Sequence, residues 1–160
     1  AREVCAVVLD DLDQRRHRFI RVNFANGDMV GHTGSLEAAI EAIEVVDECI
    51  GHLISAVEKA GATMVVTADH GNLDMMWEVD KKTGEVKLDG SGKPLIKTSH
   101  TLSPVPWSLS GAGADGFESN ADVAEPGLGN IAASLLVLLG FDPPADYLPP
   151  LIVPRGGGAR

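Results

Sequence analysis

The longest regular pattern in the chain is helical, and it lies between two runs with the character of strands. It extends from about Leu36 to Ala60, with Ser35 as a candidate N-cap and Gly61 as a stop. Its apolar positions form two adjacent stripes with helical spacing, which are Leu36, Ile40, Ile43, Ile50, Ile54 and Val57, and then Ala39, Ala42, Val46, Cys49 and Leu53. So wide an apolar face predicts a helix that packs on a sheet.

The two flanking runs favour β-structure. Phe19 to Ala25 mixes aromatic and β-branched residues and ends at the turn-forming Asn26-Gly27-Asp28, and the short run Thr63 to Thr67 has the character of a buried strand. A helix between two such strands is the βαβ arrangement of a parallel sheet. We therefore expect an α/β fold with a mostly parallel sheet flanked by helices.

The second half of the chain predicts shorter elements. Its turn residues and periodicity indicate a polar hairpin at 79–97 that frames the loop after it, a strand at 105–109, a loop at 111–120, an apolar helix at 130–139, and a Pro- and Gly-rich surface tail at 143–160. No internal repeat is present. With 160 residues and 44% apolar composition, the chain is long enough for one ordinary core, so we expect one domain or a piece of one.

Charge and cysteine content narrow the class of partner. The net charge of −10 disfavours nucleic acid, because phosphate backbones are bound by clustered Lys and Arg and the basic residues here are scattered. The longest apolar run, around Ile131 to Leu139, is too short to cross a bilayer, and Ala1 begins no signal-peptide pattern. Cys5 and Cys49 have no CxxC neighbour. We expect a reduced, cytoplasmic protein that binds small molecules and cations rather than a membrane.

Three short stretches carry carboxylates and imidazoles. Asp28 and His32 lie in NFANGDMVGHTG, Asp69 and His70 in VVTADHGN, and His100 in TSHTLSPVP. Asp28 and Asp69 both follow predicted strand ends, where open α/β sheets place their ligands. This mixture of oxygen and nitrogen donors suits Mn²⁺ or Zn²⁺. We interpret the five residues as a metal site.

Each stretch alone also has an ordinary explanation. A single D-x-x-x-H occurs by chance in many chains, and Asp69 beside His70 could be a capping carboxylate next to a core imidazole. Taken together the stretches favour joint metal binding, since they converge on one predicted sheet edge. A Ser-His-Asp hydrolytic triad is weaker, because no serine lies in a G-x-S-x-G elbow.

The three stretches, together with the ending GLGNIAASLLVLLGFDPPADYLPPLI, resemble the C-terminal motif set of the cofactor-independent (2,3-bisphosphoglycerate-independent) phosphoglycerate mutases, a branch of the alkaline phosphatase superfamily. The resemblance extends from about Phe19 to Ile152. It implies an alkaline-phosphatase-like fold that is incomplete in this chain, with residues 1–152 as the C-terminal portion of the metal-binding domain and 153–160 as a flexible tail.

The resemblance also implies a two-metal mechanism, usually with manganese, although Zn²⁺ and Co²⁺ suit the same donors. Asp28, His32 and His100 match the positions that hold one ion, and Asp69 and His70 match half of the set for the other. In the family, a serine from an earlier part of the chain takes the phosphoryl group from 3-phosphoglycerate and returns it to give 2-phosphoglycerate, without 2,3-bisphosphoglycerate. No catalytic nucleophile is therefore expected among these 160 residues.

These implications define what is expected of the isolated chain. It should be a C-terminal fragment that binds metal, is inactive by itself and is marginally stable or prone to aggregation, while the full-length enzyme is expected to be a monomer. Two alternatives stay open: another enzyme of the alkaline phosphatase superfamily, such as a phosphopentomutase or a phosphatase, and a metal-binding module without catalysis.

Overall fold

Helix α3 spans Leu36–Ala60, with both ends where the sequence predicts them. At its start Ser35 Oγ accepts a hydrogen bond from the Ala38 N–H at 3.4 Å. At its end Gly61 adopts a left-handed φ of 67°, and its N–H bonds back to the helix. The prediction is confirmed because both helix ends are encoded locally, by a side-chain cap and by a glycine that tolerates positive φ.

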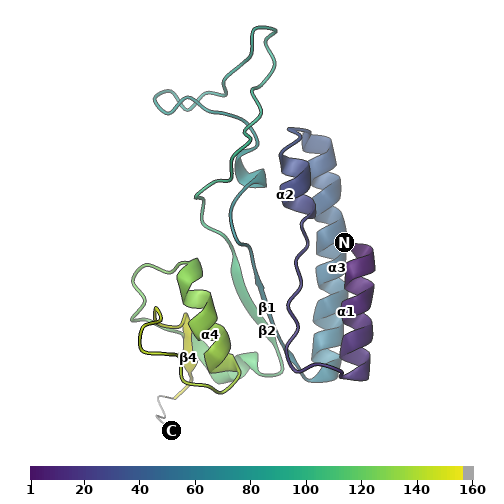
Figure 1. Cartoon of the computed structure of the whole chain (residues 1–160), viewed down its shortest axis with the longest axis vertical. Helices are drawn as coiled ribbons and strands as arrows, with labels where there is room; N and C mark the ends of the chain where they lie inside the picture. Colours follow the sequence, from purple (N-terminus) through teal and green to yellow (C-terminus); the bar gives the residue numbers. More distant parts are fainter. Residues whose placement is uncertain (157–160) are drawn as a thin grey trace. The chain divides into compact units, whose positions relative to one another are not determined.

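The computed structural model describes residues 1–156, which fall into two units divided after Gly111. In the first unit, helix α1 (Arg2–Gln14) packs along α3 (Figure 1). Their common core contains Cys5, Cys49 and Leu53, all buried, and both cysteines are free thiols. Helix α1 is not predicted from the sequence, because its apolar stripe is narrow and interrupted by charged residues.

Strand β1 (Thr63–Thr67) forms where it is predicted, directly after α3, and it pairs antiparallel with β2 (Trp107–Gly111). The burial predicted for it is wrong, because its two end residues are exposed and its three central residues are only half-buried. The register matches Thr63 with Gly111 and Thr67 with Trp107. The strand expected at 105–109 is thus present but shifted along the chain by two residues.

The strand predicted at Phe19–Ala25 is wrong. These residues form an irregular segment that runs from the end of α1 to the start of α2 (Figure 1). A strand needs a neighbour for its backbone hydrogen bonds, and among the described residues β1 pairs only with β2. The expected parallel pairing across α3 is therefore not formed, although helices and small sheets do confirm the α/β class.

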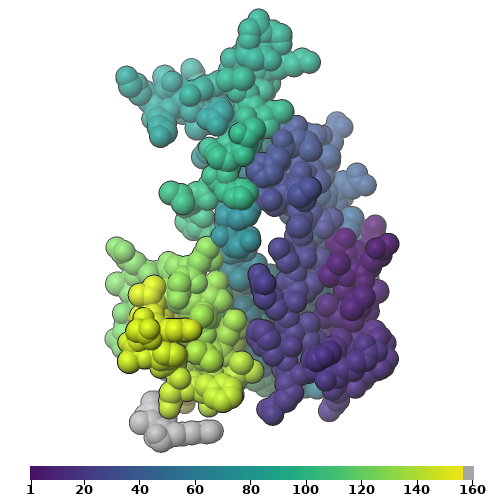
Figure 2. Space-filling view, viewed as in Figure 1, coloured from purple at the N-terminus to yellow at the C-terminus, as the bar shows by residue number. Residues whose placement is uncertain are grey.

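The segments that carry the candidate ligands lie near the N-terminal end of α3. Helix α2 (Asn26–Gly31) replaces the predicted turn, and η1 (Leu73–Met75) follows the second candidate stretch. Beyond η1, the predicted polar hairpin is present as a series of short antiparallel bridges, from Trp77 with Ile96 to Leu88 with Pro94. It projects as a largely exposed lobe (Figure 2) and returns directly into the stretch that contains His100.

In the second unit, one helix and its end agree with the sequence prediction, whereas two segments predicted to be irregular contain short elements. Helix α4 (Ile131–Leu138) is followed by Gly140 at a φ of 81°, as expected. The predicted loop at 111–120 contains η2 (Ala114–Gly116) and strand β3 (Phe117–Ser119), and the predicted surface tail contains strand β4 (Ile152–Pro154), which pairs antiparallel with β3. Residues 157–160 of that tail lie outside the described residues.

Side chains explain why the Pro-rich tail is ordered through β4. The buried Asn130, at the end of η3 (Leu128–Asn130), donates from Nδ2 to the Pro149 carbonyl at 2.7 Å. The buried Ser134 Oγ accepts the Leu151 N–H at 2.8 Å. Composition alone did not reveal these two bonds. Within residues 1–156, none of the helices has both the length and the apolar character needed to cross a membrane.

Candidate metal centre

One helical turn brings the first two candidate ligands together. Asp28 lies within α2 and His32 directly follows it, four residues later, so both side chains lie on the same face of the turn. Their closest atoms, Asp28 Oδ1 and His32 Nε2, are 3.2 Å apart. Both side chains are one-third exposed, which leaves them partly accessible to a ligand.

Two further imidazoles approach the same carboxylate oxygen. His100 Nε2 lies 3.1 Å from Asp28 Oδ1, and His70 Nε2 lies 4.0 Å from it. The rings of His70 and His100 stack, with centroids 3.5 Å apart and planes inclined by 7°. Three chain segments that are far apart in sequence therefore meet at one oxygen atom.

Asp69 is the exception among the five predicted ligands. Its side chain is 75% exposed, and its Oδ1 lies 3.6 Å from His70 Nε2. Among the described residues, Asp28, His70 and His100 form a group whose ligand atoms all lie within 4.8 Å of one another and could hold an ion. That group takes one residue from each of the three stretches, so it combines members of the two ligand sets that the resemblance implies.

Asn72 is a site residue that the sequence analysis missed. Its Nδ2 donates to Asp28 Oδ1 at 2.6 Å and lies 3.3 Å from His32 Nε2. The approach depends on Gly31, because a Cβ atom there would lie only 2.0 Å from Asn72 Oδ1. Asn72 lies in the stretch ADHGN, two residues after His70. An amide near candidate ligands is not by itself a recognisable metal-binding motif, so the sequence did not single it out.

The surroundings of Asp28 favour its ionised form. Burial alone would raise the pKa of this carboxyl. The hydrogen bond from Asn72 and the charges of His100, His32 and His70 outweigh burial, so the pKa of Asp28 lies below its ordinary value. At neutral pH the cluster therefore offers a carboxylate beside three imidazoles.

The donor set and its spacing fit a divalent cation. Two atoms bound to one ion lie no farther apart than two metal–ligand bonds, about 4.2 Å for imidazole nitrogens at about 2.1 Å. The distances from Asp28 Oδ1 to the three Nε2 atoms, 3.1, 3.2 and 4.0 Å, all satisfy this limit. Each imidazole could thus share an ion with Asp28.

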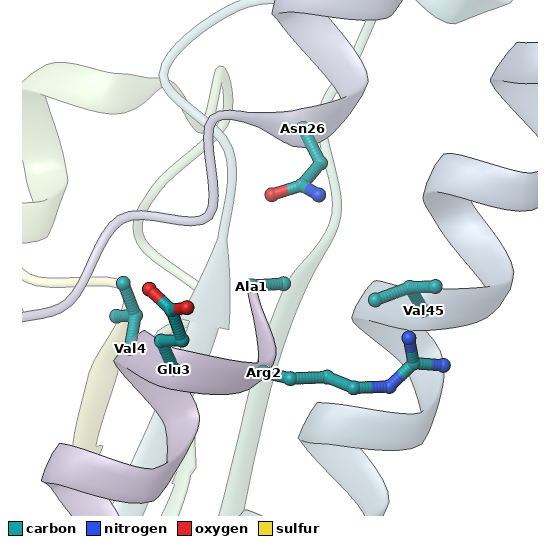
Figure 3. A pocket seen from close by; sticks show the side chains of 6 residues that line it. All are labelled: Ala1, Arg2, Glu3, Val4, Asn26 and Val45. Carbon is teal, nitrogen blue, oxygen red and sulfur yellow. The ribbon is translucent and has the colours of Figure 1, made fainter.

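A separate hollow of about 400 Å³ contains none of the predicted ligands. It is lined by Ala1, Arg2, Glu3, Val4, Asn26 and Val45 (Figure 3). The guanidinium of Arg2 is already paired with Glu48 at 2.7 Å. The candidate ligands therefore lie in the cluster around Asp28 and not in this hollow.

Comparison with known proteins agrees with this chemistry. A family model described as the metalloenzyme superfamily matches residues 1–143. The chain belongs to the metalloenzyme superfamily. The match includes all three stretches that carry the candidate ligands.

Several superfamily relatives are named as phosphoglycerate mutases. The chain is 45% identical over 141 residues to a probable 2,3-bisphosphoglycerate-independent phosphoglycerate mutase of Leptospira interrogans, covering 88% of this chain and 25% of that protein. It is 41% identical over 153 residues to the corresponding mutase of Trypanosoma brucei brucei, covering 95% of this chain and 28% of that protein. This member of the superfamily therefore spans about a quarter of the length of these curated relatives.

A solved structure extends the likeness to three dimensions. The fold matches a crystal structure of Leishmania mexicana phosphoglycerate mutase at low cobalt concentration, with a TM-score of 0.88 and 44% identity over 96% of this chain and 28% of that one. The superfamily resemblance predicted from the sequence is confirmed, and so is the expectation of an incomplete alkaline-phosphatase-like fold.

Proposed function

We propose that this chain is the metal-binding part of a cofactor-independent phosphoglycerate mutase, which interconverts 3-phosphoglycerate and 2-phosphoglycerate. The observation that carries the proposal is the convergence of Asp28, His32, His70 and His100 at one carboxylate oxygen. Relatives of 41% to 45% identity that are named as mutases support this choice over a phosphopentomutase or a phosphatase. A cytoplasmic location accompanies the proposal.

Five residues would hold divalent ions in this proposal. Asp28, His32 and His100 form one set, and Asp69 and His70 supply half of a second set. The stacking of His70 on His100 supports placing the two sets next to each other. The ions, most simply Mn²⁺ with Zn²⁺ or Co²⁺ as alternatives, would supply Lewis acidity toward phosphoryl oxygens when bound.

In this proposal, the protonation states of Asp28 and of the three imidazoles determine how well the chain binds metal. Asp28 provides a carboxylate that is ionised at neutral pH, because Asn72 and the three imidazoles lower its pKa. The imidazoles must be neutral to act as ligands, so metal loading should weaken as the pH falls through the range in which histidine becomes protonated. The nucleophilic serine and the groups that bind phosphoglycerate are assigned by the resemblance to an earlier part of the full-length enzyme.

Metal binding can be tested on the 160-residue chain itself. After dialysis against Mn²⁺, Zn²⁺ or Co²⁺, we expect at least one bound ion per chain and its loss in His100→Ala. His52→Ala is the matched control, since His52 is an exposed imidazole of α3 outside the cluster. A folded chain that binds none of the three ions would contradict the ligand assignment.

The reaction itself can be tested by replacement in the Leptospira relative, 25% of which is matched by this chain. We expect a chimera that carries the matched segment of this chain in place of the relative's own to convert 3-phosphoglycerate without added 2,3-bisphosphoglycerate. His32→Ala should abolish the conversion, and His52→Ala should not. A folded, metal-loaded chimera with no mutase activity would overturn the proposal. The 160-residue chain alone should show no turnover.

A further inference from the structure

Asp74 joins the two segments that bring His70 and His100 together. Its Oδ1 and Oδ2 accept hydrogen bonds from Thr101 Oγ1 at 3.1 and 3.0 Å, and its Oδ2 accepts a further one from Ser103 Oγ at 2.5 Å. Thr101 directly follows His100 in sequence, whereas Asp74 follows His70 by four residues. The carboxylate thus connects the two imidazole-bearing segments without itself belonging to the ligand cluster.

A backbone bridge and a glycine place the two segments at close range. The Thr101 N–H donates to the Gly71 carbonyl at 2.8 Å, and the two residues form an isolated antiparallel bridge. A Cβ atom on Gly71 would lie 2.1 Å from Thr101 Oγ1 and 2.6 Å from Asp74 Oδ1. A side chain at position 71 would displace the Thr101 hydroxyl or the Asp74 carboxylate, so this contact between the segments depends on Gly71.

The connection is polar and partly buried: Asp74 lies at the surface, and the Thr101 that it binds lies beneath it. Thr101 is buried, with 8% of its surface exposed. A carboxylate can accept several hydrogen bonds at once, which lets one side chain bind both hydroxyl groups. The side chain of His100, in contrast, is 47% exposed, so its position depends on the segment that carries it as well as on its contacts with Asp28 and His70.

We propose that Asp74 is a positioning residue of the metal centre: through Thr101 and Ser103 it holds the His100 loop so that the His100 ring stacks on His70 beside Asp28. The proposal rests on the proposed function insofar as the cluster binds metal, but the placement of His100 can be tested without metal. Loss of a residue that orients a metal ligand typically weakens metal binding about 10- to 100-fold.

The first experiment measures ring placement in the metal-free chain. We expect nuclear Overhauser effects between ring protons of His70 and His100, whose centroids are 3.5 Å apart. Asp74→Ala should abolish them, whereas Asp80→Asn should preserve them. Asp80 is the matched control, because its carboxylate accepts hydrogen bonds within a hairpin turn and contacts none of the candidate ligands.

The second experiment measures the consequence for metal. In a Co²⁺ titration followed by visible absorption, Asp74→Ala should lower the affinity about 10- to 100-fold and alter the ligand-field spectrum, with Asp80→Asn unchanged. Thr101→Val removes the Thr101 hydroxyl at nearly constant volume and keeps Asp74. If Asp74→Ala fails to fold, this variant replaces it in both the nuclear Overhauser experiment and the Co²⁺ titration. We expect it to shift both readouts in the same direction.

The outcomes separate this proposal from the proposed function. Wild-type ring contacts and an unchanged Co²⁺ spectrum in folded Asp74→Ala, or in Thr101→Val if Asp74→Ala is unfolded, would overturn the positioning role. If the wild-type chain binds no Co²⁺ but Asp74→Ala still loses the ring contacts, the positioning role is supported while the metal-site proposal fails.

Discussion

Asp28 is central to the cluster because of how its neighbours are packed, and Asn72 is the neighbour in closest contact. The amide reaches Asp28 Oδ1 at 2.6 Å only because Gly31 presents no side chain. A glycine in one candidate stretch thus makes room for an amide of another, and that amide orients the carboxylate and favours its charged form. Ligand geometry in this chain therefore depends on residues that bind no ion themselves.

Gly31→Ala tests this dependence. A Cβ atom at this position would lie 2.0 Å from Asn72 Oδ1, so the amide must move away from Asp28. We expect weaker Co²⁺ binding and a loss of stability. Gly51→Ala, within α3, is the control: a Cβ atom there would meet nothing within 4 Å, and it should stabilise the chain by about 0.5–1 kcal/mol through helix propensity. Equal metal affinity in both variants would refute the role of Gly31.

Asp74 should give the unfolding free energy a measurable pH dependence. Burial would raise the pKa of Asp74, but the hydrogen bonds from Ser103 and Thr101 and from backbone N–H groups lower it below its ordinary 3.8. A carboxyl with a lowered folded-state pKa stabilises the fold fully above its ordinary pKa, and this contribution is lost as the pH falls through the folded value.

The stability difference between the metal-free wild type and Asp74→Asn should therefore be constant near neutral pH and shrink below pH 3.8. Urea unfolding at a series of pH values measures it. A difference that does not change with pH would show that the carboxylate charge contributes nothing.

The candidate site could be predicted from the sequence as far as its charged and imidazole groups. Asp28, His32, His70 and His100 lie close together as expected, and the signal for this was the combination of three stretches rather than any one of them. Asn72 and Asp74 could not be found this way. Their importance depends on which atoms lie beside them after folding, and an amide or a carboxylate near a turn has many ordinary roles.

At the scale of the element, α3 shows how far a periodic pattern determines structure. Its limits follow from local caps and are correctly predicted. The burial of its apolar face is not correctly predicted. The stripe with Ala39, Ala42, Cys49 and Leu53 is buried, whereas Leu36, Ile40, Ile43 and Ile54 of the neighbouring stripe are exposed. A periodic pattern identifies an apolar face, but the elements packed against it decide how much of that face is covered.

The dependence on packing partners also explains why the strand predicted at residues 19–25 is absent from the structure. Their composition favours an extended chain, but whether such a chain becomes a strand depends on a partner edge, which is a tertiary property. The short strands β3 and β4 were missed for the opposite reason. Each has only three residues, too few for an alternating pattern, and their pairing is supported by distant side chains such as Ser134.

The N-cap of α3 offers a test at this scale. Ser35→Ala removes the acceptor for the Ala38 N–H, and because the bond is long at 3.4 Å we expect a loss near the lower end of the usual range, about 0.5–1 kcal/mol. Ser55→Ala is the matched control, since Ser55 Oγ donates to the Gly51 carbonyl within α3 and its removal should change stability by less than about 0.5 kcal/mol. Chemical denaturation followed by circular dichroism distinguishes the two. Equal effects would mean that the cap contributes nothing.

At the scale of the whole molecule, many large apolar side chains of the described residues remain exposed to water. The exposed fractions of Leu36, Ile40 and Ile54 are 52%, 52% and 37%. Apolar side chains that gather on one face of a long helix favour association, because burying them against another surface removes them from water. This agrees with a chain that spans about a quarter of the length of its curated relatives.

We therefore expect the 160-residue chain to self-associate as its concentration rises, and Ile40→Lys combined with Ile54→Lys to suppress this. The double variant should keep the wild-type unfolding free energy within about 1 kcal/mol, since both side chains are already partly or largely solvated in the folded chain. Sedimentation velocity over a concentration series measures association, and urea unfolding measures stability.

Leu53→Lys is the contrasting change. Only 4% of Leu53 is exposed, so an unpaired charge there should disrupt the packing of α3 rather than suppress self-association. If the double variant associates as strongly as the wild type, the exposed stripe of α3 is not the surface through which copies meet, and the edge of β1 away from β2 becomes the next surface to test.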